Sequence, residues 1–380
     1  VITRTIVKDL AHGYRIFSTE NTTGLKLGSL DIVRALILAQ IDRKKLHDHQ
    51  DEIEGNLKDM MNNLEGLSKS DKNNFVRYVW IINRGTPMNK TRLINAISAD
   101  IRSLHSGTDA KKATKQLAQA AEIYANKVIV CNSKQPYYRP HRDLIDCGFK
   151  QYRPLLISLA SRKGVTKDSY KRIFGIIETL YVRFILVGRA KPSILEPNFA
   201  SWSKQAGDKG TSVDTHIENW VNDSEKLIEV FDFRESFQQL RIPDKKAKKY
   251  RYLLSLIEEH TDPRVQKDLL GNAVAEPTLP LVEDASEWGQ AWPQFNKSHH
   301  AAELQLSIGN HFLLKAASGL TVDDGWDKRS SHYSNKGRFL GTRQFANAVR
   351  YFDETTIKQR EQTLSKTASE IWTLDRFKTP

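Results

Sequence analysis

Apolar residues recur at intervals of three and four along most of the chain up to about residue 260. This spacing places them on one face of an α-helix. It predicts helices over five segments: 30–41, 73–85, 91–130, 169–187 and 214–240. The fourth has the strongest pattern. Because the rest of its surface is also fairly apolar, we expect this helix to be buried on several sides.

The stretches between these helices have other patterns. Residues 42–72 are charged, with widely spaced apolar positions, which predicts an exposed helix. Residues 133–148 contain Pro136 and Pro140, and residues 190–213 contain Pro, Gly and Ser, so both are expected to be irregular. We therefore expect helices interrupted by two long connections.

The pattern changes beyond Pro243, where we place a domain boundary. After about residue 270, short strand-like and loop-like pieces carry Trp288, Trp292 and Trp326. We expect these tryptophans to pack in a core; stacking on a nucleic-acid base is the alternative. The chain closes with a predicted helix over 356–372.

The most distinctive local pattern is ELQLSIGNHFLLKAASG, residues 303–319. An alternating apolar run meets Gly309 and Asn310, two residue types that tolerate positive φ and favour turns, and a second apolar run follows. The pattern predicts two short strands, or a strand and a helix, that meet at a turn. Asn310 and His311 are also candidates for a metal-dependent nuclease site.

Composition narrows the class of protein. The formal charge is +13, with 27% charged and 39% hydrophobic residues, which is typical of a globular chain with an anionic partner such as nucleic acid. The sequence lacks the run of about 18 apolar residues that spans a membrane. Cys131 and Cys147 form neither a disulfide framework nor a CxxC pair, so we expect a cytoplasmic protein without a membrane partner.

Basic residues concentrate in two places beyond Pro243, and both are candidate nucleic-acid contacts because lysine and arginine pair with phosphates. An exposed helix start is the alternative for the first cluster. The candidates are Lys245, Lys246, Lys248 and Lys249 in the first cluster, and Lys328, Arg329, Lys336, Arg338 and Arg343 in the second.

Two motifs carry a family resemblance. Phe17, Asn21, Gly24, Leu27 and Asp31 fill the pattern F-x-x-x-N-x-x-G-x-x-L-x-x-x-D, followed by an apolar helix. Later come a basic KKYRYLLSLIEE helix, a tryptophan-containing loop, the IGNHFLL element and a final QREQTLSKTASEIW helix. In this order they resemble the GmrSD-like, modification-dependent restriction family. Its members join a ParB/sulfiredoxin-like nucleotide-binding domain, a helical region and an HNH-type nuclease domain.

The resemblance implies a mainly α fold with a C-terminal α+β domain of the ββα-metal, HNH-like type. Residues 1–90 would be the C-terminal remainder of a ParB-like and helical domain, 91–240 the helical region, and 241–380 the nuclease-related domain. The Asp-Gly-Gln-Gln-Arg segment that the family uses for nucleotide binding does not occur, so we expect no nucleotide cofactor.

The resemblance also implies a nuclease site in which a strand-end histidine activates water and a divalent metal stabilises the phosphate. Here the corresponding strand reads LVEDASEW, so Glu283 keeps the acidic position and Asp284 stands where the histidine belongs. We expect Glu283, Asp284 and Asn310 to hold Mg²⁺ or Mn²⁺. The expected catalytic residues are Asp284, Asn310, His311 and His332.

Three functions remain open at this stage. The first is a metal-dependent DNA endonuclease with a divergent site in a phage-restriction protein, for which modified phage DNA is the candidate substrate and a homodimer the candidate assembly. The second is a nuclease-like domain without catalysis that binds DNA or regulates a partner. The third is a helical interaction scaffold, which the basic clusters disfavour.

Overall fold

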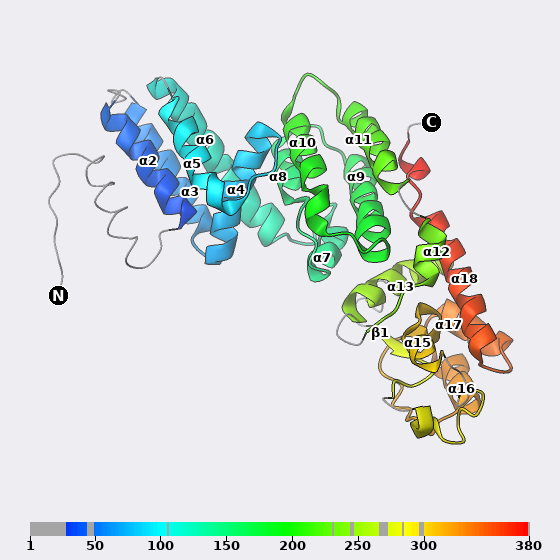
Figure 1. The fold of residues 1–380 in the computed structure, drawn as a ribbon. Coiled ribbons are helices and arrows are strands. Elements are labelled where there is room, and N and C mark those ends of the chain that lie inside the picture. The colour runs from blue at the N-terminus through cyan, green and yellow to red at the C-terminus, as the bar shows by residue number, and fades with distance from the viewer. Residues whose placement is uncertain are drawn as a thin grey trace, which may run out of the picture. The chain divides into compact units, whose positions relative to one another are not determined.

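The computed structural model is mainly helical in the part of the chain that it describes (Figure 1). A two-stranded antiparallel sheet accompanies the helices. The mainly α expectation is confirmed, and the strand content is smaller than an α+β domain suggests. The described residues are 28–43, 49–104, 106–229, 232–243, 247–265, 273–282, 285–295 and 300–378. The first motif, apart from Asp31, therefore lies outside the described residues.

The chain forms two compact units that are interleaved along the sequence. The first unit comprises 1–139, 150–172 and 192–220, and the second comprises 140–149, 173–191 and 221–380. The predicted nuclease-related domain, 241–380, is thus one part of the second unit. Three helices cross the division: α7 (Tyr138–Asp146), α9 (Lys167–Leu180) and α11 (Val213–Ile228).

The other elements of the first unit are all helical in the residues that the structure describes. Its helix α4 shows how local sequence sets the bounds: Ser68 accepts a hydrogen bond from the Asp71 amide at the start, and Gly85 adopts φ 73° at the end. The predicted helix end at Gly85 is confirmed. The elements are α2 (Ser29–Arg43), α3 (Gln50–Leu64), α4 (Lys69–Arg84), α5 (Lys90–Arg102), α6 (Gly107–Ile123), η2 (Tyr124–Ile129), α8 (Arg153–Ser161), η4 (Pro192–Leu195) and α10 (Glu196–Gly207).

Three stretches differ from their sequence predictions. Within 42–72, helix α3 buries a complete apolar stripe against α6, so it is not an exposed helix. Within 133–148, helix α7 replaces the expected irregular chain. Within 190–213, α10 replaces the expected loop: a proline in its first turn suits a helix start, and Trp202 is fully buried and stacks on Trp220.

The second unit contains the sheet and the C-terminal helices. Strand β1 pairs with β2 antiparallel, with Val274 opposite Leu314 and Pro277 opposite His311. In Figure 1, α15, α16 and α17 gather beside this sheet. The elements are η3 (Tyr181–Val187), α12 (Phe233–Gln238), α13 (Ala247–Thr261), β1 (Val274–Pro277), η6 (Ala285–Trp288), α15 (Ala301–Leu306), η7 (Ile308–Asn310), β2 (His311–Leu314), α16 (Trp326–Lys336), α17 (Leu340–Ala348), α18 (Glu354–Ile371) and η8 (Asp375–Phe377).

An aromatic core holds these elements together. Trp288, Trp292 and Trp326 are buried in it, as predicted, and Trp326 stacks on Phe352 with ring centroids 5.0 Å apart. Each of the three indole N–H groups donates to a backbone carbonyl, which removes the cost of burying a polar atom. The core therefore holds the start of α16 against Val349 and Phe352, which lie between α17 and α18.

Candidate functional site

The Gly309–Asn310 turn joins helix α15 to strand β2. A helix and a strand therefore meet at the predicted turn, but in the reverse order: the alternating run that predicted a strand begins in α15, and the strand follows the turn. Asn310 is fully buried. Its amide nitrogen donates to the carbonyls of Leu279 and Gln305 at 2.9 Å each, and its oxygen accepts from the Leu279 amide at 2.6 Å. The Asn310 side chain therefore satisfies the backbone N–H and carbonyl of Leu279, which lies two residues after β1.

Helix α18 holds the same turn from the other side. Arg360 donates to the carbonyls of Ile308, Gly309 and His311, at distances between 2.7 and 3.2 Å, and lies 3.7 Å above the Phe312 ring. Burial lowers the pKa of Arg360 to about 9, which leaves it charged at neutral pH. A guanidinium that faces three carbonyls is a structural anchor for the turn.

His311 is buried beside the turn, with 3% of its surface exposed. Its Nδ1 lies 2.8 Å from the Ser307 carbonyl oxygen, so Nδ1 carries the proton. Burial is the main cause that lowers the pKa of His311 to about 4, and the Arg360 charge acts in the same direction. The ring is therefore neutral at pH 7, with an unprotonated Nε2.

The remaining predicted catalytic and metal-binding residues do not join this cluster in the described structure. Glu283 and Asp284 lie outside the described residues. His332 is half-buried on α16, with its ring edge-on to Tyr333. Among the residues that are described, no three His, Cys, Asp or Glu side chains gather in a way that could hold a metal ion.

The predicted nucleic-acid contacts fall into different environments. Lys245 and Lys246 lie outside the described residues, whereas Lys248 is exposed and Lys249 half-buried on α13. Lys328 is exposed but pairs with Asp324 at 2.5 Å, and this hydrogen bond holds the pKa of Asp324 at about 2. The Lys328 ammonium group thus already has a carboxylate partner.

Arg329 requires a correction, because it does not lie on an exposed basic face. Only 2% of its surface is exposed. Its guanidinium donates to the carbonyls of Asp324 and Thr321 at 2.9 and 2.7 Å and lies 3.8 Å from Glu276. Sequence alone could not separate it from Lys328, since helical position decides which neighbour points inward.

Lys336, Arg338 and Arg343 do form an exposed cluster, at the connection between α16 and α17. Gly337 permits the close packing of this connection, because a Cβ there would lie 2.1 Å from the Tyr333 carbonyl oxygen and 3.2 Å from Arg343 Cγ. In the described structure, none of the three pairs with a carboxylate. We call residues 326–350, which comprise α16, α17 and their connection, the basic helix pair.

Sequence analysis missed Arg350, which is exposed directly after α17. The signal was present: residues 328–352 contain six lysines and arginines and no aspartate or glutamate. A cation in such a stretch has no local carboxylate to neutralise it. Arg350 lies two residues beyond the end of α17 and adds a fourth exposed cation to Lys336, Arg338 and Arg343.

A buried carboxylate fixes the start of α17. Glu258 accepts a hydrogen bond from the Gly341 amide at 2.9 Å, and α17 has no side-chain cap of its own. Gly341 leaves room for this carboxylate, since a Cβ there would lie 2.7 Å from Glu258 Oε2 and the Glu258 side chain would have to move. Burial raises the pKa of Glu258, and the hydrogen bonds from Gly341 and Leu340 oppose this rise.

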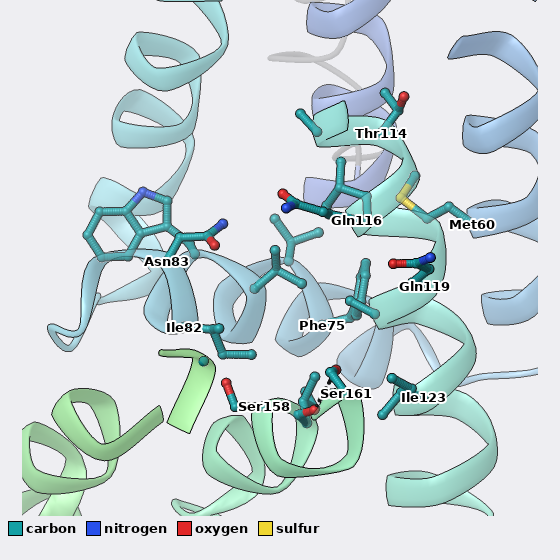
Figure 2. Close-up of a pocket in the computed structure, with 18 of the residues that line it drawn as sticks. Met60, Phe75, Ile82, Asn83, Thr114, Gln116, Gln119, Ile123, Ser158 and Ser161 are labelled. Atoms are coloured by element: carbon teal, nitrogen blue, oxygen red, sulfur yellow. Dashed lines mark hydrogen bonds between the residues drawn. The ribbon is translucent and has the colours of Figure 1, made fainter. Parts of the chain in front are cut away.

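The first unit contains a pocket of about 650 Å³, lined mainly by helices α2, α4, α5, α6 and α8. Figure 2 shows the apolar Phe75, Ile82 and Ile123 in its wall together with the amide side chains of Asn83 and Gln116. No predicted site residue lines this pocket, and the function proposed below does not involve it.

No known family model and no curated protein matches the chain. Among the described residues, no helix combines the length and the apolar composition that crossing a bilayer requires.

Proposed function

We propose that the second unit binds DNA through the basic helix pair. The observation that supports this most directly is the group of four exposed cations, Lys336, Arg338, Arg343 and Arg350, in a stretch without a carboxylate. Arginine pairs with phosphate oxygens through two parallel N–H bonds, and each phosphate that is neutralised releases counterions. Such a surface favours a polyanion over a neutral partner.

The position of the cations on packed helices strengthens the proposal. Gly337 and the Glu258 hydrogen bond fix the connection and the start of α17, so the side chains extend from a defined backbone. Defined backbone lowers the ordering cost of each phosphate contact. The family resemblance implies a cytoplasmic phage-defence protein that binds modified phage DNA, and we include this setting in the proposal. We also include assembly as a homodimer.

Metal-dependent DNA cleavage is the second candidate function, and the group that would serve it is Nε2 of His311, although burial and a pKa of about 4 make this imidazole a weak base. A neutral imidazole with its Nδ1 proton fixed on a carbonyl leaves Nε2 unprotonated, which is the form of a general base or metal ligand. Asn310 argues against a role in metal binding, because its side-chain amide already makes three hydrogen bonds to backbone. Any Mg²⁺ or Mn²⁺ would then depend on Glu283 and Asp284.

DNA binding is tested by fluorescence anisotropy with a labelled 20-base-pair duplex at several salt concentrations. Neutralising two cations, in Arg338→Gln/Arg343→Gln, should raise Kd by about tenfold or more and reduce the salt slope by about 2, since each lost phosphate contact reduces it by about 1. The matched control is Lys112→Gln/Lys115→Gln, two exposed lysines on α6. Equal losses in both double variants, or no binding at low salt, would contradict the proposal.

Cleavage is tested by incubating plasmid with the protein and Mg²⁺ or Mn²⁺, with and without EDTA. Nicking that requires metal and is lost in Asp284→Ala supports the second candidate. His311→Gln distinguishes a role for the imidazole from a role for the carboxylate alone. DNA binding without nicking in any condition leaves binding as the function.

A further inference from the structure

Tyr351 is an aromatic side chain left in solvent directly beside the basic helix pair. It is 81% exposed, the highest value among the large hydrophobic side chains that are exposed in the described chain. Its neighbour Arg350 is exposed as well, whereas Phe352 on the other side is buried in the aromatic core. This ring adds little to the stability of the fold, because apolar surface is stabilising only when it is buried.

The backbone around Tyr351 is firmly held. The Tyr351 carbonyl accepts from the Thr356 hydroxyl at 3.0 Å, and the Phe352 carbonyl accepts from the side-chain amide of Gln294 at 2.7 Å. Two residues earlier, the Val349 carbonyl accepts from the Trp326 indole at 3.1 Å. The ring therefore projects from a fixed segment, and a contact to it orders only the side chain itself.

We propose that Tyr351 is a stacking platform for an unpaired base, and that the basic helix pair binds single-stranded nucleic acid in preference to duplex. This inference rests on the proposed function and deepens it. A single strand offers phosphates to Arg343 and Arg350 and a base face to Tyr351. Duplex DNA offers the same phosphates, but its base faces are covered by neighbouring bases except at the ends.

An anionic membrane surface is another partner that could use tyrosine together with arginine. It fits less well, because insertion requires several apolar side chains at one place. Between residues 328 and 352, Tyr351 is the one exposed large hydrophobic side chain that the structure records. A single ring flanked by cations matches a nucleotide better than a bilayer.

The experiment measures fluorescence anisotropy of three labelled probes: a 15-nucleotide oligothymidylate, an abasic 15-mer with the same phosphates, and a 15-base-pair duplex. Wild type should bind oligothymidylate more tightly than either other probe. Tyr351→Ala should weaken oligothymidylate binding by about 5- to 150-fold, the range expected for loss of one stacked base, and Tyr351→Phe should retain it. Tyr351→Ala should change binding of the abasic strand by less than twofold.

The outcomes separate this inference from the proposed function. If wild type binds no probe, DNA binding itself fails. If the duplex binds as tightly as oligothymidylate, or if Tyr351→Ala has the same affinity for oligothymidylate as wild type, only the stacking role is overturned. Binding to phosphatidylserine-containing vesicles that Tyr351→Ala abolishes, without binding to oligothymidylate, would assign the surface to a membrane. Because Tyr351 is exposed, its variants are expected to fold.

Discussion

The imidazole of His311 is held neutral by the surroundings that also fix its orientation. In the unfolded chain a histidine has its ordinary pKa near 6.5, whereas burial lowers the pKa of folded His311 to about 4. Between these values the unfolded chain binds more protons than the folded chain. Stability from this residue is therefore complete above about pH 6.5 and is lost as the pH falls toward 4.

His311→Gln should remove this pH dependence, because the glutamine amide can still donate to the Ser307 carbonyl but cannot take up a proton. The quantity to compare is the free energy of unfolding of wild type minus that of the variant. This difference should fall by about 3 kcal/mol from pH 7 to pH 4, because each unit of pKa shift corresponds to about 1.4 kcal/mol. Urea unfolding followed by circular dichroism measures it. His332→Gln serves as the control, and a difference that is the same at both pH values would contradict the assignment.

The residue types of Asn310, His311 and Arg329 did not show whether each side chain serves a functional site or stabilises the fold. Asn310 and His311 were predicted as site residues from their types and order, and the partners that now explain them are backbone carbonyls of Leu279, Gln305 and Ser307. Backbone groups are the same at every position, so nothing in the sequence marks which of them a side chain will reach. The burial of Arg329 escaped prediction for the same reason.

At the scale of elements, η7 and α18 of the second unit pack in close contact at Gly309. A Cβ at Gly309 would lie 2.4 Å from the Ile357 carbonyl oxygen, a backbone atom that cannot turn aside. The Arg360 hydrogen bonds to three carbonyls require this short separation. Gly309 is thus explained by packing between two elements, in addition to its place in a turn.

Gly309→Ala should lower the free energy of unfolding by about 1–3 kcal/mol, the usual cost of overpacking. Gly55→Ala is the matched control: this glycine lies within helix α3, and nothing is within 4 Å of an added Cβ. That variant should be more stable by about 0.5–1 kcal/mol. Urea unfolding checks both, and a Gly309→Ala protein as stable as wild type would refute the packing explanation.

Elements with a regular apolar period were predictable, and those defined by tertiary contacts were not. The helices over 30–41, 73–85 and 169–187 were all found, although the last continues from α9 into the π-helical η3. Helix α10 was missed because its proline and serines suggest a loop, whereas packing of Trp202 against Trp220 favours the helix. Tertiary burial outweighs a weak local signal.

At the scale of the whole molecule, the second unit draws on residues well before the predicted boundary at 240. Tyr252 and Trp372 both donate to the Glu178 carboxylate, at 2.9 and 3.2 Å. Arg183 donates to the Trp372 carbonyl at 3.1 Å and lies 4.5 Å above the Phe233 ring. A segment cut at 240 would leave these groups of the C-terminal helices without partners.

A fragment of residues 241–380 should therefore be less stable than a fragment of residues 140–380, which contains every residue of the second unit. Loss of Glu178 alone leaves the buried Tyr252 hydroxyl and Trp372 indole unsatisfied, at about 1–3 kcal/mol for each group. Near-ultraviolet circular dichroism during urea unfolding compares the two. Coincident, equally cooperative transitions would show that 241–380 is an independent domain.

The contact between Trp326 and Phe352 gives the protein a built-in optical probe. The indole stacks on the ring next in sequence to Tyr351 and donates to the carbonyl of Val349. A ligand that seats on the Tyr351–Arg350 surface would perturb the electric field at this indole and shift its emission. Association could then be followed on unlabelled material, with Trp326→Phe identifying which of the seven tryptophans responds.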